Sequence, residues 1–393
     1  MRIAFVNTDS GVPAFGRKGS SIHLQEMIRG FLCSGATVDL FTARVDGDSP
    51  PGLEAVRVHQ LPKRSEGDLA EREQSALRAN EQTRSALERE GLFDFVYERY
   101  ALWNFAGMEY ANAAGIPGVL EVNAPLIDEQ AAHRGLVDRA GAERATRQAF
   151  GAARALVAVS AEVAAYLEQR PEATGRVHVV TNGVDVARFR PDVAPSLLAA
   201  PGTFTVGFVG TLKPWHGLPT LVDAFALLRE QVPNSRLLIV GDGPEREKFE
   251  EQLERRGVRP AANMTGAVFS AQIPSLLASM SAAVAPYPHS SKFYFSPLKV
   301  YEYMAAGLPV VASRIGQLDG LLEDGVNGLL CPPGDAAALA QALIRLSCDP
   351  QLAARLGWAA RATVSAHYTW SSVVARVLEI AGTRQFEAVP GRR

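Results

Sequence analysis

Short apolar runs alternate with amphipathic segments of helical length along this chain, and that alternation narrows the folds open to it. Residues 2–7, RIAFVN, have the composition of a buried strand. Residues 20–35 place apolar side chains at helical spacing and end at a glycine, and residues 37–43, TVDLFTA, form the next apolar run. A strand, a helix and a second strand in this order favour a parallel sheet with helical crossovers. The sequence therefore predicts an α/β fold.

The alternation occurs twice, on either side of a segment rich in proline. Residues 190–203 hold three prolines and a glycine, a composition typical of a linker. Before it, we expect a charged, exposed helix over 66–90 and further strands in DFVYERY, GVLEVNAP and ALVAVSAE. After it, we expect strands in FTVGFVG, RLLIVGDGP, ANMTG, AAVAPYP and PVVAS, with helices that begin near Leu218 and Glu245.

Chain length supports two domains, because 393 residues are too many for one ordinary core. We expect two doubly wound, Rossmann-like domains that face a central cleft, residues 1–190 and residues 191–368. The amphipathic helix within 369–393 is expected to pack back on the first domain. Open parallel sheets bind ligands at the carboxyl ends of their strands, so this fold favours a nucleotide or another phosphorylated ligand.

Charge and cysteine content exclude several classes of function. The net charge of −2 gives no overall attraction to nucleic acid or to an anionic membrane. The three cysteines, Cys33, Cys331 and Cys348, form neither a metal-binding spacing nor a disulfide framework, which indicates a reducing, cytoplasmic location. The apolar run at the N-terminus is too short for a signal peptide, and no stretch approaches the ~20 apolar residues of a membrane span.

One short helix carries an unusual cation. In FSPLKVYEYMAAG, residues 295–307, Ser296 suits the N-cap, Pro297 the first helical position, and Gly307 the left-handed position past the end. Lys299 then falls in the first turn, where the helix dipole disfavours a cation by roughly 0.3–1 kcal/mol. Either Lys299 is a solvated surface residue that forms an exposed pair with Glu302, or an anion from outside the chain lies beside it.

Several polar residues in the second half suit a nucleoside diphosphate. The free N–H groups at the start of this helix can bind phosphate oxygens, and the Glu302 carboxylate can accept hydrogen bonds from paired ribose hydroxyls. The stretch TLKPWHG places Lys213 and His216 on a strand-to-helix loop, where both can donate to oxyanions. The alternative is a solvated lysine beside a structural histidine. VGDGPE lacks the residues of a phosphate loop and is expected to be a turn.

Together these stretches resemble glycosyltransferase family 4, retaining enzymes of the GT-B architecture. The resemblance is most specific in FVGTLKPWHGLPTLVDAFALL, RLLIVGDGPER, YEYMAAGLPVVAS and EDGVNGLLCPPGD, and it extends to GRKGSSIHLQEMIRGFLCSGATVDLFTA and LEVNAPL in the first half. Where the family has the first of two glutamates spaced eight apart, the one that contacts the donor sugar, this chain has Tyr294. His216 and Thr211 occupy the places of a usual lysine and a usual arginine.

The resemblance implies roles for residues at matching positions. In the donor nucleotide-sugar site it implies Gly19, Thr211, Val268, Ser296, Pro297, Leu298 and Glu302. The expected catalytic residues are Lys213, His216 and Lys299, which neutralise the leaving diphosphate, and Asn123, which stands where many members have a histidine beside the donor sugar. For the acceptor, the first-half loops offer Ser20, His23, Asp128 and Glu129.

The expected activity is transfer of a sugar, with retention, from a UDP- or GDP-sugar to a small soluble acceptor such as a sugar, cyclitol, thiol or secondary metabolite. No cofactor or metal is expected, because the cations can neutralise the diphosphate. The alternatives are a nucleotide-sugar epimerase or hydrolase of the same fold, and a non-catalytic nucleotide-sugar binding protein. We expect no partner among nucleic acids and no integral membrane association, and the sequence leaves a homodimer open.

Overall fold

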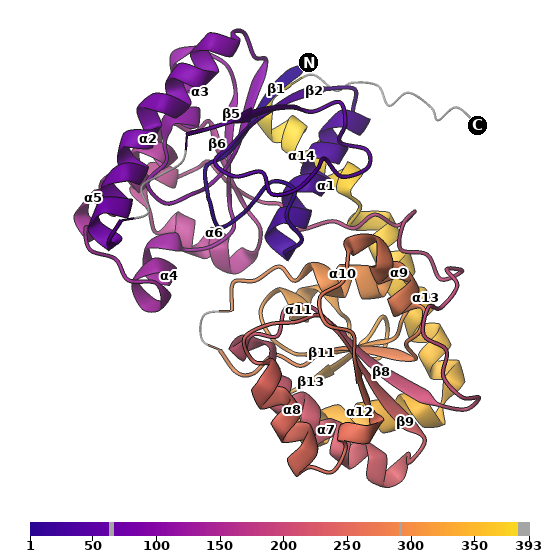
Figure 1. The fold of residues 1–393 in the computed structure, drawn as a ribbon. Coiled ribbons are helices and arrows are strands. Elements are labelled where there is room, and N and C mark those ends of the chain that lie inside the picture. The colour runs from indigo at the N-terminus through magenta and orange to yellow at the C-terminus, as the bar shows by residue number, and fades with distance from the viewer. Residues whose placement is uncertain (63–66, 291–292, 384–393) are drawn as a thin grey trace. The chain divides into compact units, whose positions relative to one another are not determined.

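The computed structural model describes residues 1–62, 67–290 and 293–383, and the chain divides into two compact units. The first contains Met1–Asn182, Tyr294–Ser296 and the chain from Trp370 onward, and the second contains Gly183–Phe293 and Pro297–Thr369 (Figure 1). The division falls after Asn182, ahead of the segment 190–203. Residues 183–189, between the division and this segment, belong to the second unit. There the Val184 N–H donates to the Tyr368 carbonyl at 2.8 Å.

The first unit is built on a seven-stranded parallel sheet with the order β3-β2-β1-β4-β5-β6-β7. Strands β1, β2, β4, β5 and β6 coincide with predicted strands, whereas the two edge strands β3 and β7 were not predicted. Both edge strands are short, β3 is largely exposed and β7 is half-buried at most, so neither has the buried apolar run that identifies a strand in the sequence. The bounds are β1 Arg2–Asn7, β2 Thr37–Thr42, β3 Arg57–Gln60, β4 Phe95–Arg99, β5 Gly118–Val122, β6 Ala155–Ala158 and β7 Val177–Val179.

Helices connect these strands and pack on the sheet. They are α1 Gly19–Cys33, α2 Leu69–Glu90, α3 Ala106–Ala113, α4 Leu126–His133, α5 Arg139–Ala152, α6 Ala161–Glu168, the 3-10 turn η1 Pro171–Ala173, and α14 Trp370–Ala381. The start of the helix predicted at residue 66 lies outside the described residues. The prediction that this helix is exposed is wrong for one of its faces, since α2 buries Glu73, which accepts hydrogen bonds from the N–H groups of Val137 and Asp138.

Helix α14 packs on α1 in the first unit. The two helices approach so closely that a Cβ on Gly30 would lie 2.5 Å from Cγ2 of Val374. At the start of α14, the Trp370 ring meets the His23 ring edge to face, with centroids 5.3 Å apart. The last ten residues of the predicted C-terminal segment, 384–393, lie outside the described residues.

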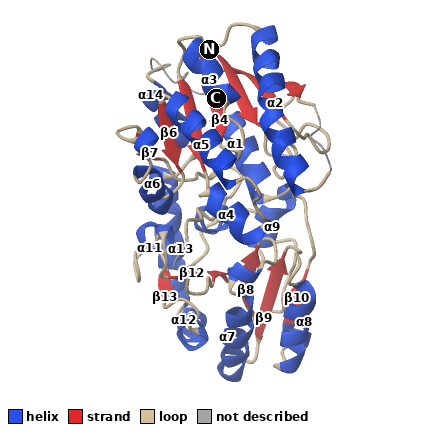
Figure 2. Ribbon diagram, turned by 90° about the vertical axis from the view of Figure 1, so that its left-hand side faces the viewer, coloured by secondary structure: helices blue, strands red, loops and turns tan. Residues whose placement is uncertain are grey.

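The second unit is built on a six-stranded parallel sheet with the order β10-β9-β8-β11-β12-β13. Figure 2 shows the strands of each unit with the helices around them. The strands are β8 Phe204–Val209, β9 Ser235–Val240, β10 Ala262–Met264, β11 Ala282–Ala285, β12 Val310–Ser313 and β13 Leu329–Cys331. The helices are η2 Pro214–His216, α7 Leu218–Gln231, α8 Arg246–Arg255, η3 Arg259–Ala261, η4 Ser270–Gln272, α9 Ile273–Leu277, α10 Leu298–Ala305, α11 Gln317–Leu321, α12 Ala336–Cys348 and α13 Pro350–His367.

Each unit thus has the parallel α/β fold that the sequence predicts. The starts predicted near Leu218 and Glu245 correspond to α7 and α8. Within the described ranges, no helix combines the length and the apolar character that crossing a membrane requires.

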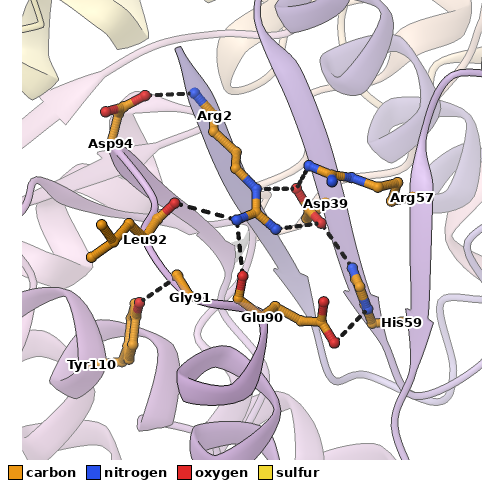
Figure 3. A network of polar contacts seen from close by, with 9 residues as sticks. All are labelled: Arg2, Asp39, Arg57, His59, Glu90, Gly91, Leu92, Asp94 and Tyr110. Atoms are coloured by element: carbon orange, nitrogen blue, oxygen red, sulfur yellow. Dashed lines mark hydrogen bonds and ion pairs between the residues drawn. The ribbon is translucent and has the colours of Figure 1, made fainter.

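A buried carboxylate ties together the amino ends of three strands in the first unit (Figure 3). Asp39, at the start of β2, accepts hydrogen bonds from Arg2 on β1 at 2.9 and 3.1 Å, and it pairs with Arg57 and His59 on β3 at 2.8 Å each. Burial opposes ionisation of Asp39, but the hydrogen bonds from Arg2 and His59 outweigh it and lower the pKa of this carboxyl. The network lies at the amino ends of the strands, so its role is structural.

Replacement of Asp39 by Asn should therefore lower the stability of the protein. Charge-assisted hydrogen bonds contribute about 1.5–3 kcal/mol each, and the two arginines can regain water, so we expect a loss of about 2 kcal/mol at pH 7. Because the folded-state pKa of Asp39 is lowered, this stability is present above the unfolded pKa and is lost as pH falls through the folded pKa. Urea denaturation measures both effects. Asp46→Asn, in the exposed Arg44–Asp46 pair, is the control and should change stability by less than about 0.5 kcal/mol.

Candidate active site

The loops at the carboxyl ends of β8, β9 and β11 pack backbone against backbone in the second unit. Gly217 has a φ of 66°, and a Cβ there would lie 1.6 Å from the carbonyl oxygen of Pro286. Gly241 has a φ of 140°, and a Cβ there would lie 2.1 Å from the carbonyl oxygen of Gly210. Only glycine permits both the backbone conformation and these approaches. The three loops therefore form one rigid floor at the edge where parallel sheets bind ligands.

Helix α10 begins beside this floor, one residue later than predicted. Its first residue is Leu298, and Pro297 is the N-cap residue without a capping side chain. The predicted N-cap role of Ser296 is wrong, because the Ser296 carbonyl accepts from the Asn182 side chain at 2.6 Å and its hydroxyl accepts from the Asn182 N–H at 3.4 Å. The left-handed residue after the helix is confirmed at Gly307, with a φ of 73°.

The Lys299 ammonium is buried and has no hydrogen-bond partner among the described residues. Its Nζ lies 4.0 Å from the centroid of the Phe208 ring and 5.8 Å from that of Tyr287. Burial lowers the pKa of Lys299 to about 7, against the opposing effect of the nearby Glu302 carboxylate. The alternative of a solvated surface lysine is therefore wrong. A buried cation without a hydrogen-bonding partner is costly, and an anion arriving at α10 would remove that cost.

His216 lies against the same two aromatic rings but carries no charge. Its ring centroid is 5.8 Å from that of Phe208 and 5.7 Å from that of Tyr287. Burial, and then the neighbouring Lys299, lower the pKa of His216 to about 3. Nδ1 donates to the carbonyl of Thr211 at 2.6 Å, which leaves Nε2 unprotonated. The expected role of His216 in neutralising the leaving diphosphate therefore requires that it first take up a proton, because burial and the neighbouring Lys299 favour its neutral form.

The structure brings most of the predicted donor-site residues to this place. Lys213 lies on the same loop as His216, with Nζ 5.5 Å from the Trp215 ring centroid, and it contributes to the lowered pKa of His216. Glu302 lies one turn along α10 from Leu298 and is half-buried. Lys299 as a whole is also half-buried, although its ammonium group is fully buried. Val268 is placed elsewhere along the sheet, in the loop after the edge strand β10.

The predicted residues of the first unit fall into two groups. Gly19 and Ser20 open helix α1, and His23 follows on the same helix. His23 and Asn123 both contact the Glu121 carboxylate, which was not predicted as a site residue. A Glu121 oxygen lies 3.4 Å from His23 Nε2, and the carboxylate accepts a hydrogen bond from Asn123 Nδ2 at 2.8 Å. A buried acid within the apolar strand GVLEV could have identified Glu121.

The two carboxylates predicted for the acceptor lie on α4. Asp128 pairs with Arg139 at 2.9 Å. Glu129 accepts from the Tyr294 hydroxyl at 3.0 Å and lies 3.3 Å from Arg134. Across the parts of the chain that the structure covers, no group of three or more His, Cys, Asp or Glu side chains is placed to hold a metal ion.

Two family models match the chain. The model described as "Glycosyltransferase Family 4" matches residues 17–188, and the model described as "Glycosyl transferases group 1" matches residues 203–349. A glycogen synthase of Mycobacterium tuberculosis is 30% identical over 209 residues, which are 52% of this chain and 48% of that protein. In that comparison the chain spans about half the length of the relative.

Two further similarities extend over almost the whole chain. A D-inositol 3-phosphate glycosyltransferase of Pseudarthrobacter chlorophenolicus is 28% identical over 92% of this chain and 89% of its own. HepE of Anabaena, solved in complex with UDP and glucose, has a TM-score of 0.73 and 22% identity over 98% of this chain and 100% of its own. The structural similarity shows the GT-B fold. The chain belongs to glycosyltransferase family 4.

The lowered pKa of Lys299 predicts that donor binding depends on pH. An anionic ligand favours the charged ammonium, so above pH 7 a proton must be taken up on binding, and affinity should fall by up to tenfold per pH unit. Calorimetric titration of UDP-glucose and GDP-mannose between pH 6.5 and 9 measures this slope. Besides Glu302, the titratable groups near Lys299 are His216 and Tyr287, and the pKa of His216 lies below this range.

Lys299→Met, which keeps the length of the side chain, should bind more weakly at pH 7 and lose the slope. An affinity of the wild-type protein that does not change across this range would contradict the assignment of Lys299 to the anion site.

Proposed function

We propose that the protein transfers a sugar, with retention at the anomeric carbon, from a UDP- or GDP-sugar to a small soluble acceptor. The proposal rests on the unpartnered Lys299 ammonium beside the start of α10. The free N–H groups of α10 and the ammonium together form a site for a diphosphate. We assign the hydrogen bonds of the ribose hydroxyls to the carboxylate of Glu302, one turn further along the helix.

The proposed catalysis depends on charge that develops when the bond to the diphosphate breaks. Lys213 and Lys299 carry positive charge to that group, and fixed cations in a buried site stabilise developing charge more than the same cations in water. His216 is neutral in the free protein, so its Nε2 can donate to an oxyanion only after it takes up a proton. The two lysines supply the neutralising charge in this proposal, which includes no metal ion or cofactor.

The proposal assigns donor binding to the second unit and acceptor binding to the first. Retention is proposed because the chain belongs to a family of retaining enzymes, and no carboxylate is assigned as a base behind the acceptor. HepE of Anabaena, with the same fold, was solved with UDP. Cys33, Cys331 and Cys348 are free thiols, which fits a reducing compartment such as the cytoplasm.

Product analysis tests the transfer and its stereochemistry. The protein is incubated with an α-linked UDP- or GDP-sugar and a panel of neutral sugars and cyclitols, and the fresh product is examined by proton NMR of the anomeric coupling. We expect an α-linked product. A β-linked product would overturn retention, whereas consumption of the donor in the absence of any acceptor would identify an epimerase or hydrolase. Nucleotide binding without turnover would identify a binding protein.

Glu302→Gln should weaken donor binding while the fold is preserved. The change keeps the size of the side chain and removes a charged acceptor, whose hydrogen bond contributes about 1.5–3 kcal/mol, so the Kd for the nucleotide should rise at least tenfold. Glu247→Gln, an exposed carboxylate on α8 of the same unit, is the matched control and should leave the Kd unchanged. Calorimetry on both variants makes the comparison, and equal affinities would remove Glu302 from the site.

A further inference from the structure

A buried carboxylate in the first unit gathers donors from three elements. Glu121, near the carboxyl end of β5, is 3% exposed. It accepts hydrogen bonds from the Tyr97 hydroxyl and, at 2.8 Å, from Asn123 Nδ2, and its oxygens lie 3.3 Å from Arg99 Nη1 and 3.4 Å from His23 Nε2. Burial opposes the charge of Glu121, but a charged His23, Arg99 and these hydrogen bonds lower the pKa of this carboxyl. At neutral pH, where His23 has lost its proton, the Arg99 guanidinium and the hydrogen bonds from Tyr97 and Asn123 still favour the ionised form of Glu121.

An ionised carboxylate accepts hydrogen bonds and cannot donate them, so Glu121 fixes the orientation of both partners. The amide of Asn123 must turn Nδ2 toward Glu121 and Oδ1 away from it. The neutral His23 ring, whose pKa is lowered mainly by burial, must carry its proton on Nε2 and a free lone pair on Nδ1. Neither Asn123 Oδ1 nor His23 Nδ1 has a hydrogen-bond partner among the described residues.

Other buried polar atoms near the same sheet edge also lack partners. Ser21 Oγ, two residues before His23 on α1, and Asn7 Oδ1, at the end of β1, belong to residues that are 0% exposed and have no partner in the described chain. The Asn7 amide is oriented too, because its Nδ2 donates to the Val12 carbonyl at 2.7 Å. Leaving a buried polar atom unpaired costs about 1–3 kcal/mol, so this concentration indicates a missing hydrogen-bonding partner.

We propose that this edge of the first unit binds a neutral polyhydroxyl compound, with Asn123 Oδ1 and His23 Nδ1 as acceptors of its hydroxyl hydrogens and Glu121 as their positioning residue. The inference rests on the proposed function, in which the polyol is the sugar acceptor. Arg99 Nε has no hydrogen-bond partner among the described residues, but the Glu121 carboxylate balances the charge of its guanidinium. The oriented acceptor atoms disfavour a phosphate or carboxylate, so the ligand class is an unphosphorylated sugar or cyclitol.

Wild-type protein tests the ligand class without any substitution. Saturation-transfer NMR and calorimetry are carried out on the full chain with myo-inositol, glucose and mannose, and with glucose 6-phosphate and mannose 6-phosphate as charged counterparts. We expect at least one neutral compound to bind, and to bind about tenfold more tightly than its phosphate. Failure of all three neutral compounds, or tighter binding of the phosphates, overturns the proposal and leaves ordered water as the partner of these atoms.

Substitutions then test the positioning role. Glu121→Gln allows the Asn123 amide and the His23 tautomer to reverse, and Asn123→Ala removes one acceptor. Each should weaken polyol binding about tenfold, as expected for the loss of about one hydrogen bond, and Glu121→Gln should also narrow the preference for the neutral compound over its phosphate. Glu73→Gln, a buried glutamate on α2 of the same unit whose carboxylate already accepts from the N–H groups of Val137 and Asp138, is the matched control and should change neither quantity.

Nucleotide binding separates this inference from the proposed function. UDP and GDP should bind to Glu121→Gln and Asn123→Ala within about twofold of wild type, because their proposed site lies in the second unit. A protein that binds the polyol but no nucleotide would retain the inference and overturn the proposed function. Unchanged polyol affinity in both variants, at wild-type unfolding midpoints, overturns the inference alone.

Discussion

The buried ammonium of Lys299 is the constraint around which the second unit is arranged. It packs on the face of Phe208, at a distance of 4.0 Å from the ring centroid, and has no hydrogen-bond acceptor among the described residues. A cation–π contact offsets part of the cost of removing such a charge from water, but it does not replace a hydrogen bond. The loops that carry Gly210 and Gly241 pack closely together beside the Lys299 ammonium, and any side chain at Gly241 would displace the Gly210 backbone. With a pKa of about 7 the ammonium is only partly charged near neutral pH, and an anion that binds beside it favours the charged form.

The first unit carries balanced charges at the corresponding edge of its own sheet, because the Glu121 carboxylate lies 3.3 Å from the Arg99 guanidinium. Glu121 faces the donors of His23 and Asn123, and their acceptor atoms have no hydrogen-bond partner among the described residues. A group-transfer enzyme with a charged leaving group and a neutral nucleophile needs this division, because cations stabilise the departing diphosphate while hydrogen-bond acceptors orient a hydroxyl. Each unit thus has the electrostatics that its proposed substrate requires.

Local sequence patterns were sufficient to predict the central strands and the class of fold. Strand β1 has the predicted bounds, Arg2–Asn7, because every residue after Arg2 in it is buried and the apolar run has no competing interpretation. Strands β3 and β7 could not be predicted in this way, since short edge strands without a buried apolar run owe their conformation to pairing with a neighbour. The start of α10 was misplaced by one residue because Ser296 hydrogen-bonds to Asn182, more than a hundred positions earlier in the chain.

The candidate site shows a sharper limit, because the charge state of a residue depends on contacts that its sequence neighbours do not reveal. Lys299 and His216 were identified as site residues from their places on a helix start and a loop. The neutral state of His216, however, follows from its burial beside Lys299, 83 positions away. The family resemblance cannot supply this information either, since it transfers the position of a residue and not its protonation.

Two glutamates on adjacent strands of one sheet show how neighbouring groups decide the charge of a buried carboxyl. Glu98 on β4 and Glu121 on β5 are both buried, and each lies in an apolar strand sequence. Burial raises the pKa of Glu98 to about 8, because its opposing contacts come from the amide of Asn104 and the Met108 N–H, and neither carries a charge. Glu121 meets the same burial, but the Arg99 guanidinium and the donors of His23, Tyr97 and Asn123 lower its pKa. The partners of each carboxyl, rather than its burial, therefore decide whether it is a neutral core residue or a fixed charge that orients a site.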